Sequence, residues 1–266
     1  MYNYLHNEGG SAHCELVMEV REVIDNSNSN HRVCIYSNDE IAQNIHRIRE
    51  DINSILKSLG RDESDVILLG ACKTMDKDVT DFVIRNRLLD ALGDNKVQEL
   101  LDKYEYSEAV PWHFIGNLQT NKVKYIIDKV TLIHSLDRVS LAKEIDKQAK
   151  KHDKIMECLI EVNIGEEESK GGVLPKDIDE FVEAVQGFDN IRIKGLMSVM
   201  PNEKDKALLD SYYDKFNAIF EKLKLVFGDE FTIKSIGMSG DYATALKHGA
   251  NLIRIGRLIF GERRYS

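Results

Sequence analysis

The stretch Val66-Ile67-Leu68-Leu69-Gly70-Ala71-Cys72-Lys73-Thr74 indicates both the fold class and a candidate reactive group. An unbroken apolar run of strand length that ends in small residues is typical of a strand buried on both faces, as in a parallel sheet. Lys73 follows this run, where a dry interior meets a loop. Desolvation there would lower the pKa of the amine and favour Schiff-base chemistry. Taken alone, the stretch favours the simpler interpretation, a solvated loop lysine.

Apolar segments of similar length recur along the rest of the chain and alternate with segments of helical character. The strand candidates are 66–72, 88–93, 112–116, 130–135, 156–163, 191–197, 231–236 and 252–256. The helix candidates are 41–59, 76–87, 96–104, 119–128, 138–151, 175–185, 204–227 and 241–248. Eight such units, with no second block, predict an α/β protein made of a single (β/α)8 TIM barrel. A doubly wound open sheet is the alternative, and eight regular units favour closure.

The first 38 residues differ in composition from the rest of the chain. Residues 1–11 are polar, and residues 26–30 form a low-complexity tract of asparagine and serine. We interpret residues 1–38 as an N-terminal appendage with the composition of a mobile segment, and residues 39–266 as the barrel. Order is expected to begin near Ser37, because capping residues stand there before an apolar helical pattern.

Composition is that of an ordinary globular protein, with 42% hydrophobic and 30% charged residues in a chain of 266. The formal net charge of −9 argues against a general binder of nucleic acid or anionic membranes. No apolar run approaches the roughly 20 residues of a membrane span, and the N-terminus lacks the order of a signal peptide. Scattered cysteines without a CxxC motif indicate a reducing cytoplasm and no metal site. These are Cys14, Cys34, Cys72 and Cys158.

A phosphate site is expected after the seventh and eighth strands, where barrels of this type often bind phosphate. Gly237-Met238-Ser239-Gly240-Asp241 directly precedes a helix, so its amides, the Ser239 hydroxyl and the helix dipole could cradle an anion. The eighth strand ends at Gly256, which would let the backbone approach, and Arg254 or Arg257 could add charge. The simpler interpretation is a capping serine with solvated arginines. Because the 237–241 loop and the arginines at the end of the eighth strand occur together at this position, we favour a phosphate cradle.

Lys73 gains a partner from this arrangement, because strand one closes against strand eight in a barrel. A lysine beside a phosphate cradle predicts an aldehyde-bearing phosphate held as an imine, either pyridoxal 5'-phosphate (PLP) or a sugar phosphate. Asn95, after the second strand, could bond a ring substituent or cap a helix, and spacing does not decide. Met197 and Ser198 end the sixth strand and are candidates for the pocket wall, although a core methionine is the commoner outcome.

Two further groups favour structural interpretations. His113 lies on the third strand between Trp112 and Phe114, and a hydrogen-bonded core histidine is favoured over a general base. The run Glu166-Glu167-Glu168 is interpreted as a solvated loop rather than a metal site.

Several short motifs follow one another in a characteristic order. They are Ala71-Cys72-Lys73-Thr74, Gly93-Asp94-Asn95 with Gln98-Glu99, the run 112–122, the loop 165–172, Gly195-Leu196-Met197-Ser198, Gly237-Met238-Ser239-Gly240-Asp241 and Arg254-Ile255-Gly256. In this order they resemble the YggS/PROSC family of pyridoxal phosphate homeostasis proteins. The resemblance runs from about residue 39 to the C-terminus and leaves the N-terminal appendage unexplained. Cys72 stands where the family commonly has serine, and Leu92, Asp94 and Lys96 depart from a usual Phe-Gly-Glu-Asn-Tyr stretch.

The resemblance implies a single barrel of the fold-type III class of PLP-binding proteins, akin to the N-terminal domain of alanine racemase. It implies that Lys73 carries the cofactor as an internal aldimine, that Asn95 lies near the pyridine ring, and that four residues bind the phosphate. Those four are Ser239, Gly240, Arg254 and Gly256. The full set that we assign to the cofactor is Lys73, Asn95, Met197, Ser198, Met238, Ser239, Gly240, Arg254 and Gly256.

The expected function is PLP homeostasis, in which the protein buffers the cofactor or delivers it to PLP-dependent apo-enzymes. Racemases of this barrel type carry a second, β-rich domain, and the sequence ends about ten residues after the eighth strand. We therefore expect no second acid/base group opposite the lysine and no well-defined catalytic reaction. The alternatives are a weak PLP-dependent amino-acid racemase or related enzyme, and a Schiff-base aldolase acting on a sugar phosphate. Monomer and weak dimer both remain open.

Overall fold

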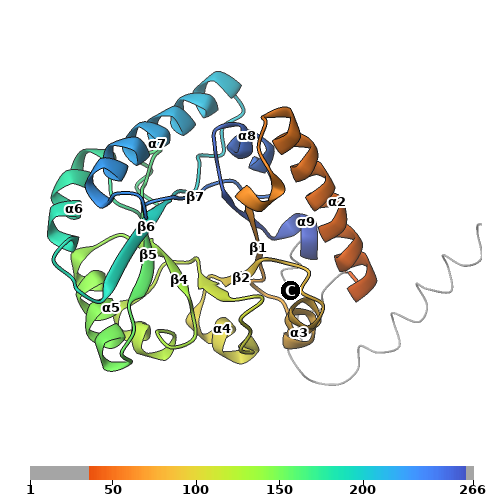
Figure 1. Ribbon diagram of the computed structural model, residues 1–266, viewed down its shortest axis with the longest axis horizontal. Helices are drawn as coiled ribbons and strands as arrows, with labels where there is room; N and C mark the ends of the chain where they lie inside the picture. The colour runs from red at the N-terminus through yellow and green to blue at the C-terminus, as the bar shows by residue number, and fades with distance from the viewer. Residues whose placement is uncertain (1–35, 262–266) are drawn as a thin grey trace, which may run out of the picture. The chain divides into compact units, whose positions relative to one another are not determined.

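A closed barrel of eight parallel strands forms the centre of the described chain, with neighbouring strands in sequence order and β8 closing on β1 (Figure 1). The computed structural model describes residues 36–261, so almost all of the predicted N-terminal appendage lies outside the described residues. The strands are β1 (Ile67–Ala71), β2 (Ala91–Asp94), β3 (Trp112–Phe114), β4 (Leu132–Leu136), β5 (Met156–Glu161), β6 (Ile191–Met197), β7 (Ile233–Ser235) and β8 (Leu252–Ile255). The predicted (β/α)8 barrel is confirmed, and the open-sheet alternative is wrong.

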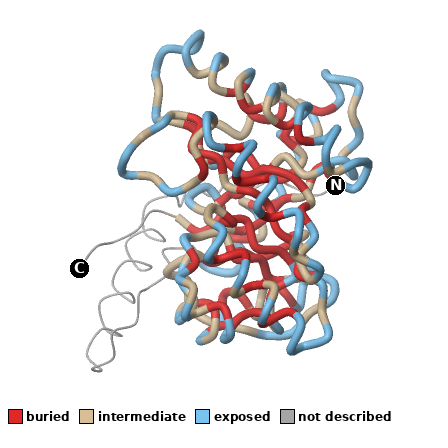
Figure 2. The backbone as a smooth tube through the Cα atoms, turned by 90° about the vertical axis from the view of Figure 1, so that its left-hand side faces the viewer, coloured by how far each residue is buried: buried red, intermediate tan, exposed pale blue. Residues whose placement is uncertain are grey.

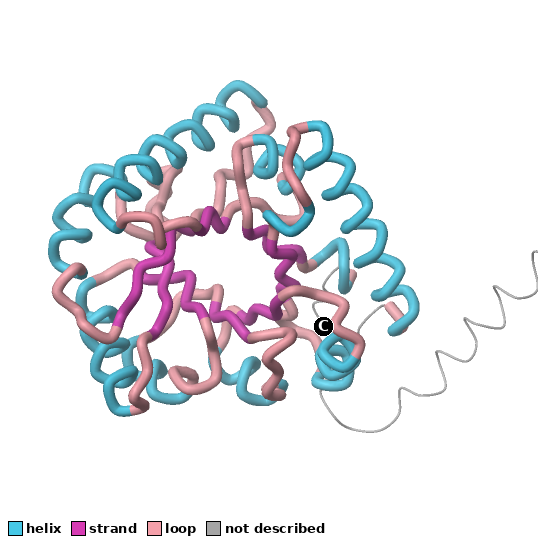
Figure 3. The backbone as a smooth tube through the Cα atoms, in the orientation of Figure 1, coloured by secondary structure: helices cyan, strands magenta, loops and turns pink. Residues whose placement is uncertain are grey.

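Helices surround these strands as an outer ring (Figure 3). The α-helices are α2 (Asn38–Ser58), α3 (Lys77–Arg85), α4 (Val97–Lys103), α5 (Val139–Lys151), α6 (Ile178–Val185), α7 (Lys206–Phe227), α8 (Tyr242–Lys247) and α9 (Arg257–Phe260). Three 3-10 helices complete the set, η1 (Glu63–Asp65), η2 (Thr120–Tyr125) and η3 (Pro175–Asp177).

The α-helix predicted over residues 119–128 is wrong, because this segment forms the 3-10 helix η2 and a turn. Gln119 at its N-cap makes no side-chain cap bond. Val123 and Ile126 are both fully buried and stand three residues apart, a spacing that matches the period of a 3-10 helix. The β-branched residues there also lower the preference for an α-helix. Helix α9 was not anticipated from the sequence.

The predicted start of order at Ser37 corresponds to a capping box. Ser37 caps α2 through the amide of Glu40, and the Glu40 carboxylate accepts the amide of Ser37 at 2.7 Å. The buried face of α2 is made of five residues of the predicted apolar pattern, Ile41, Ile45, Ile48, Ile52 and Leu56, whereas Leu59 of that pattern is exposed. Each such side chain contributes about 1.5–3 kcal/mol when fully buried.

Buried residues run through the middle of the molecule (Figure 2). A large cluster fills the space between strands and helices, and a small one fills the barrel interior. The inner cluster is made of Leu69, Ala91, Leu132, Leu159, Met197 and Leu252. Because strand residues alternate between two faces, these positions identify the inward set of β1, β2, β4, β5, β6 and β8. Polar residues continue this inward set toward the carboxyl ends of the strands.

The closure of the barrel is uneven. Strand β5 pairs with β6 along its whole length, from Met156 opposite Ile191 to Glu161 opposite Met197. In contrast, β7 pairs with β8 through one residue pair, Ser235 with Leu252. The loops that follow β7 and β8 therefore stand on either side of the shortest strand pairing in the barrel. Among residues 36–261, no helix has both the length and the apolar composition to cross a membrane.

Candidate functional site

Lys73 lies at the predicted place, in the turn after the carboxyl end of β1, and it is partly buried. Strand β1 pairs with β8 on one side, Gly70 opposite Ile255, and with β2 on the other, Ala71 opposite Gly93. The lysine is therefore flanked by the ends of β2 and β8, which carry other predicted site residues. The next residue, Thr74, has a positive φ of 69°, which β-branched residues rarely adopt.

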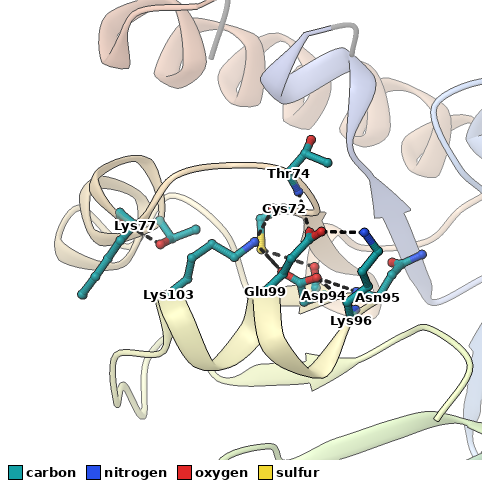
Figure 4. Close-up of polar contacts among 10 residues, drawn as sticks. Cys72, Thr74, Lys77, Asp94, Asn95, Lys96, Glu99 and Lys103 are labelled. Carbon is teal, nitrogen blue, oxygen red and sulfur yellow. Dashed lines mark hydrogen bonds and ion pairs between the residues drawn. The ribbon is translucent and has the colours of Figure 1, made fainter. Parts of the chain in front are cut away.

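Two charged side chains of α4 hold the backbone on both sides of Lys73 (Figure 4). Lys103 Nζ donates to the Cys72 carbonyl oxygen at 2.8 Å and forms an ion pair with Asp94 Oδ2 at 2.5 Å. The Thr74 amide donates to Glu99 Oε2 at 2.9 Å. Burial raises the pKa of the Cys72 thiol to about 12, so this cysteine remains protonated and does not compete with the lysine as a nucleophile.

The residues of the predicted cradle lie in the loop after β7 and around the start of α9, which follows β8. Within the described residues, the backbone amides of Ser239 and Gly240 donate to no protein acceptor. The Leu258 amide donates to Ser239 Oγ at 3.4 Å, which ties the two loops together. A side chain at Gly240 would meet no atom within 4 Å, whereas one at Gly256 would lie 3.0 Å from the Ala71 carbonyl oxygen. Unused amides beside the end of β1 suit an oxyanion.

Two hydrogen bonds to the side chain of Asp241 stabilise the loop after β7. Its Oδ1 accepts the Met238 amide at 2.7 Å, and its Oδ2 accepts the Tyr213 hydroxyl at 2.7 Å. Gly237 has φ of 95°, and a Cβ there would lie 2.6 Å from the Cβ of Ala245. Helix α8 contains only six residues, so its dipole is a smaller contribution to anion binding than the local amides.

Asn95 follows β2, next to the end of β1. Its Oδ1 is buried and has no hydrogen-bond partner among the described residues. Its backbone amide donates to Asp94 Oδ1 at 2.7 Å, so the residue itself is held in place. A buried amide oxygen without a partner costs about 1–3 kcal/mol, and native proteins keep few of them. This orphaned acceptor is available for a donor group of a ligand at the ends of β1 and β2.

A hydrogen-bonded chain of side chains crosses the barrel interior. Arg254 Nη1 donates to the Ser235 carbonyl and hydroxyl oxygens, each at 2.6 Å. Ser235 Oγ lies 3.0 Å from His134 Nδ1, and His134 Nε2 lies 3.1 Å from His113 Nδ1. The chain can be satisfied with both rings neutral, for example with the Ser235 hydroxyl donating to His134 and His134 Nε2 donating to His113. His113 is thus a hydrogen-bonded interior histidine, the interpretation favoured by the sequence.

Burial determines the charges of this chain. It lowers the pKa of His113 to about 4 and holds the pKa of His134 well below its usual value, where His113 and Arg254 lower it further. Burial also lowers the pKa of Arg254 to about 10, which leaves the guanidinium charged at neutral pH. The barrel interior therefore contains a positive arginine beside two neutral histidines.

The other residues predicted for the cofactor site lie partly inside the barrel and partly at its rim. The guanidinium of Arg254 lies inside the barrel, where Nη2 also donates to the Ser198 carbonyl at 3.0 Å. Arg257 is exposed at the start of α9. Ser198 donates its hydroxyl to the Val162 carbonyl at 2.7 Å, and Met197 belongs to the inner apolar cluster. Met238 is 36% exposed at the rim of the cradle.

Sequence reasoning missed Glu161, at the end of β5. Burial, with the neighbouring Asp137, raises its pKa to about 7, and Arg254 opposes this shift. Glu161 and Val199 contribute to a cavity of about 130 Å³ between the ends of β5 and β6. Nothing in the local sequence distinguishes this glutamate from solvated ones. Among the described residues, no group of three or more His, Cys, Asp or Glu side chains could hold a metal ion.

Comparison with known proteins gives one family match and several close relatives. Residues 37–264 match the family model described as alanine racemase, N-terminal domain. A pyridoxal phosphate homeostasis protein of Aquifex aeolicus is 42% identical over 226 residues, which cover 84% of this chain and 98% of that protein. The protein of the same name from Escherichia coli K12 is 30% identical over 236 residues, 85% of this chain and 98% of that one.

Solved structures show the same fold. A protein of unknown function from Bifidobacterium adolescentis has a TM-score of 0.78 and 26% identity, covering 87% of this chain and all (100%) of that chain. PipY of Synechococcus elongatus, solved with PLP bound, has a TM-score of 0.69 and 23% identity, covering 83% of this chain and 100% of that one. The family resemblance inferred from the ordered motifs is confirmed.

Proposed function

This chain belongs to the alanine racemase N-terminal domain family, among its pyridoxal phosphate homeostasis proteins, and from that premise we propose that it binds PLP through Lys73. We further propose that it takes part in intracellular PLP homeostasis by buffering the cofactor or delivering it to PLP-dependent apo-enzymes. The observation that carries the proposal is the orphaned buried oxygen of Asn95 beside Lys73. It calls for a ligand that can donate a hydrogen bond at the edge of the lysine's site.

The residues present fit the cofactor. When bound, PLP would supply an aldehyde, which the Lys73 amine could hold as an imine with loss of water. Ser239 and Gly240 offer unused amides for the phosphate, and Gly256 lets the backbone come close to it. The unpartnered Asn95 Oδ1 would accept a hydrogen bond from a donor group of the bound cofactor.

The other predicted residues complete the pocket in this proposal. Arg254 supplies positive charge from inside the barrel, where an anionic ligand at the strand ends would be attracted to it. Met197, Ser198 and Met238 contribute to the walls of the pocket and its rim.

A carrier role is the conclusion that the relatives' names favour, since they describe homeostasis rather than a reaction. A weak PLP-dependent amino-acid enzyme is the second candidate, and Glu161 is the observation that favours it. A carboxyl group at the strand ends with a pKa of about 7 can both accept and donate a proton near neutral pH, as a general acid or base does. A cytoplasmic location remains part of the proposal.

The test of the proposal uses Lys73→Ala with Lys77→Ala as its control. Lys77 lies on α3 and forms a surface ion pair with Asp81, so its loss leaves the strand ends intact. The unchanged protein and Lys77→Ala are expected to show the visible absorbance of a Schiff base with PLP. Borohydride should then attach the cofactor at residue 73. Lys73→Ala should show neither signal, and full retention of the absorbance would remove Lys73 from the site.

Turnover separates the two candidates. A carrier releases PLP to an apo-enzyme and leaves free amino acids unchanged over hours. A weak enzyme would racemise or decarboxylate at least one amino acid in a Lys73-dependent manner, and Glu161→Gln would reduce that rate. A broad amino-acid screen followed by chiral chromatography distinguishes these outcomes.

A further inference from the structure

Two peptide groups that flank Lys73 are held by side chains of one short helix. On the N-terminal side, the Cys72 carbonyl oxygen accepts from Lys103 Nζ at 2.8 Å. On the C-terminal side, the Thr74 amide donates to Glu99 Oε2 at 2.9 Å. Figure 4 shows Glu99 and Lys103 reaching from α4 toward the strand ends. The lysine thus stands between two backbone groups whose partners are both charged.

Lys103 is itself fixed by Asp94 at the end of β2. The side chains of Lys103 and Asp94 are only 4% and 0% exposed, and their ion pair is 2.5 Å long. Asp94 Oδ1 also accepts the amide of Asn95 at 2.7 Å. Desolvation offsets much of the stabilisation that a buried ion pair provides, so its value lies more in defining one geometry. Here that geometry joins the peptide before Lys73 to the residue that offers the orphaned oxygen.

Thr74 adds a second sign that this turn is constrained. Its φ of 69° lies in the left-handed region, which is costly for a β-branched residue. Such a conformation persists only when the surrounding contacts enforce it, and the Glu99 bond to the Thr74 amide is one of these contacts. The direction in which the Lys73 side chain leaves the backbone depends on this turn.

We propose that Glu99 and Lys103 are positioning residues for Lys73. They hold the turn of residues 72–74 so that the amine is directed at the cofactor aldehyde before the cofactor arrives. The proposal rests on the PLP function proposed above. Positioning of a nucleophile acts on the rate of bond formation, because a misplacement of about 1 Å can cost on the order of 100-fold in rate.

The experiment measures how fast cofactor-free protein captures added PLP, by stopped-flow absorbance of the Schiff base. Glu99→Ala removes the acceptor of the Thr74 amide, and Glu99→Gln retains an oxygen in the same place. Gln98→Ala is the matched control, because Gln98 is exposed on the same helix and bonds only Asp102 among the described residues. We expect Glu99→Ala to slow capture at least about tenfold, Glu99→Gln to stay within about threefold, and Gln98→Ala to match the unchanged protein.

Two further measurements separate positioning from general stability. The pH at which the Schiff-base absorbance titrates should shift in Glu99→Ala and return in Glu99→Gln, which a purely structural role would not produce. Thr74→Gly relieves the left-handed strain while it keeps the amide, so it should fold at least as stably yet capture PLP more slowly.

Capture by both Glu99→Ala and Thr74→Gly at the unchanged rate, with an unchanged titration, would overturn the proposal. Failure of the unchanged protein to form any adduct at Lys73 would instead overturn the PLP function itself. The two results are distinct.

Discussion

At the scale of single residues, the barrel interior combines one charged arginine with two histidines that burial keeps neutral. His134 bonds on both ring nitrogens, toward His113 and toward Ser235. A proton added to either histidine would place a second buried charge near Arg254. Folding therefore depends on these rings remaining neutral.

The stability of the fold should decrease as the pH falls below about 6.5. The pKa of histidine in an unfolded chain is near 6.5, and burial lowers the pKa of His113 in the fold to about 4. Between these values the unfolded chain binds a proton that the fold does not, so protonation favours unfolding. The loss reaches about 3 kcal/mol for His113 at the acid end of this range, at 1.36 kcal/mol for each pKa unit. Urea unfolding measured between pH 5 and 8 reports the slope.

His113→Asn removes the titrating ring and should flatten part of that slope. The exposed His46, whose side chain is 74% accessible, provides the control as His46→Gln and should leave the slope unchanged. Parallel pH profiles for His113→Asn and the unchanged protein would contradict this role of His113.

At the scale of elements, the turn after β3 supports the end of β2. A Cβ added at Gly116 would lie 2.2 Å from the Asn95 carbonyl oxygen and 2.6 Å from its Cα. These are backbone atoms, so the turn or the strand end would have to move. Close approach of the two chain segments thus restricts where the Asn95 backbone can lie at the end of β2.

Gly116→Ala should therefore affect both stability and cofactor binding. We expect about 1–3 kcal/mol of destabilisation from the forced backbone shift. PLP affinity should fall about tenfold or more, because Asn95 is displaced from the lysine. Gly187→Ala is the control, since Gly187 is exposed and a Cβ there meets nothing within 4 Å. Fluorescence titration with PLP and urea unfolding measure the two effects, and unchanged affinity in Gly116→Ala would separate Asn95 from the site.

At the scale of the whole molecule, the family match begins at the same residue as the capping box of α2. The match spans residues 37–264, and Ser37 caps α2 through Glu40. We expect a chain that starts at Tyr36 to fold and to bind PLP as the full chain does. Circular dichroism and PLP titration check this, and lost binding in the shortened chain would assign residues 1–35 a part in the site.

Periodicity and turn chemistry in the sequence predicted most of the architecture. Apolar runs marked all eight strands, and the order of the units implied the barrel. Lys73 and the loop around Ser239 could be singled out because each follows a strand at the end where barrel sites lie. Local signals suffice for such features.

Other features depend on closure of the barrel, and no pattern in the neighbouring sequence predicts them. His134 and Ser235 are 101 positions apart and meet only because β4 and β7 face each other across the barrel. The Asp94–Lys103 pair likewise joins a strand end to a helix whose packing the sequence does not specify. Burial of Glu161 depends on the loop of residues 165–172 and the neighbouring strands. The 3-10 helix η2 shows that tertiary packing can override an α-helical pattern.

The short pairing of β7 with β8 has a mechanical consequence. One residue pair joins these strands, and the loops after them meet through Ser239 and Leu258. An anion bound by both loops would add a further link across this short pairing, beside the hydrogen bonds that Arg254 donates to Ser235. Occupancy would then stiffen the cylinder as a whole, since a ligand that binds only the closed form adds its own binding free energy to closure. Without the bound anion, β7 and β8 would lack this additional link and could separate more readily.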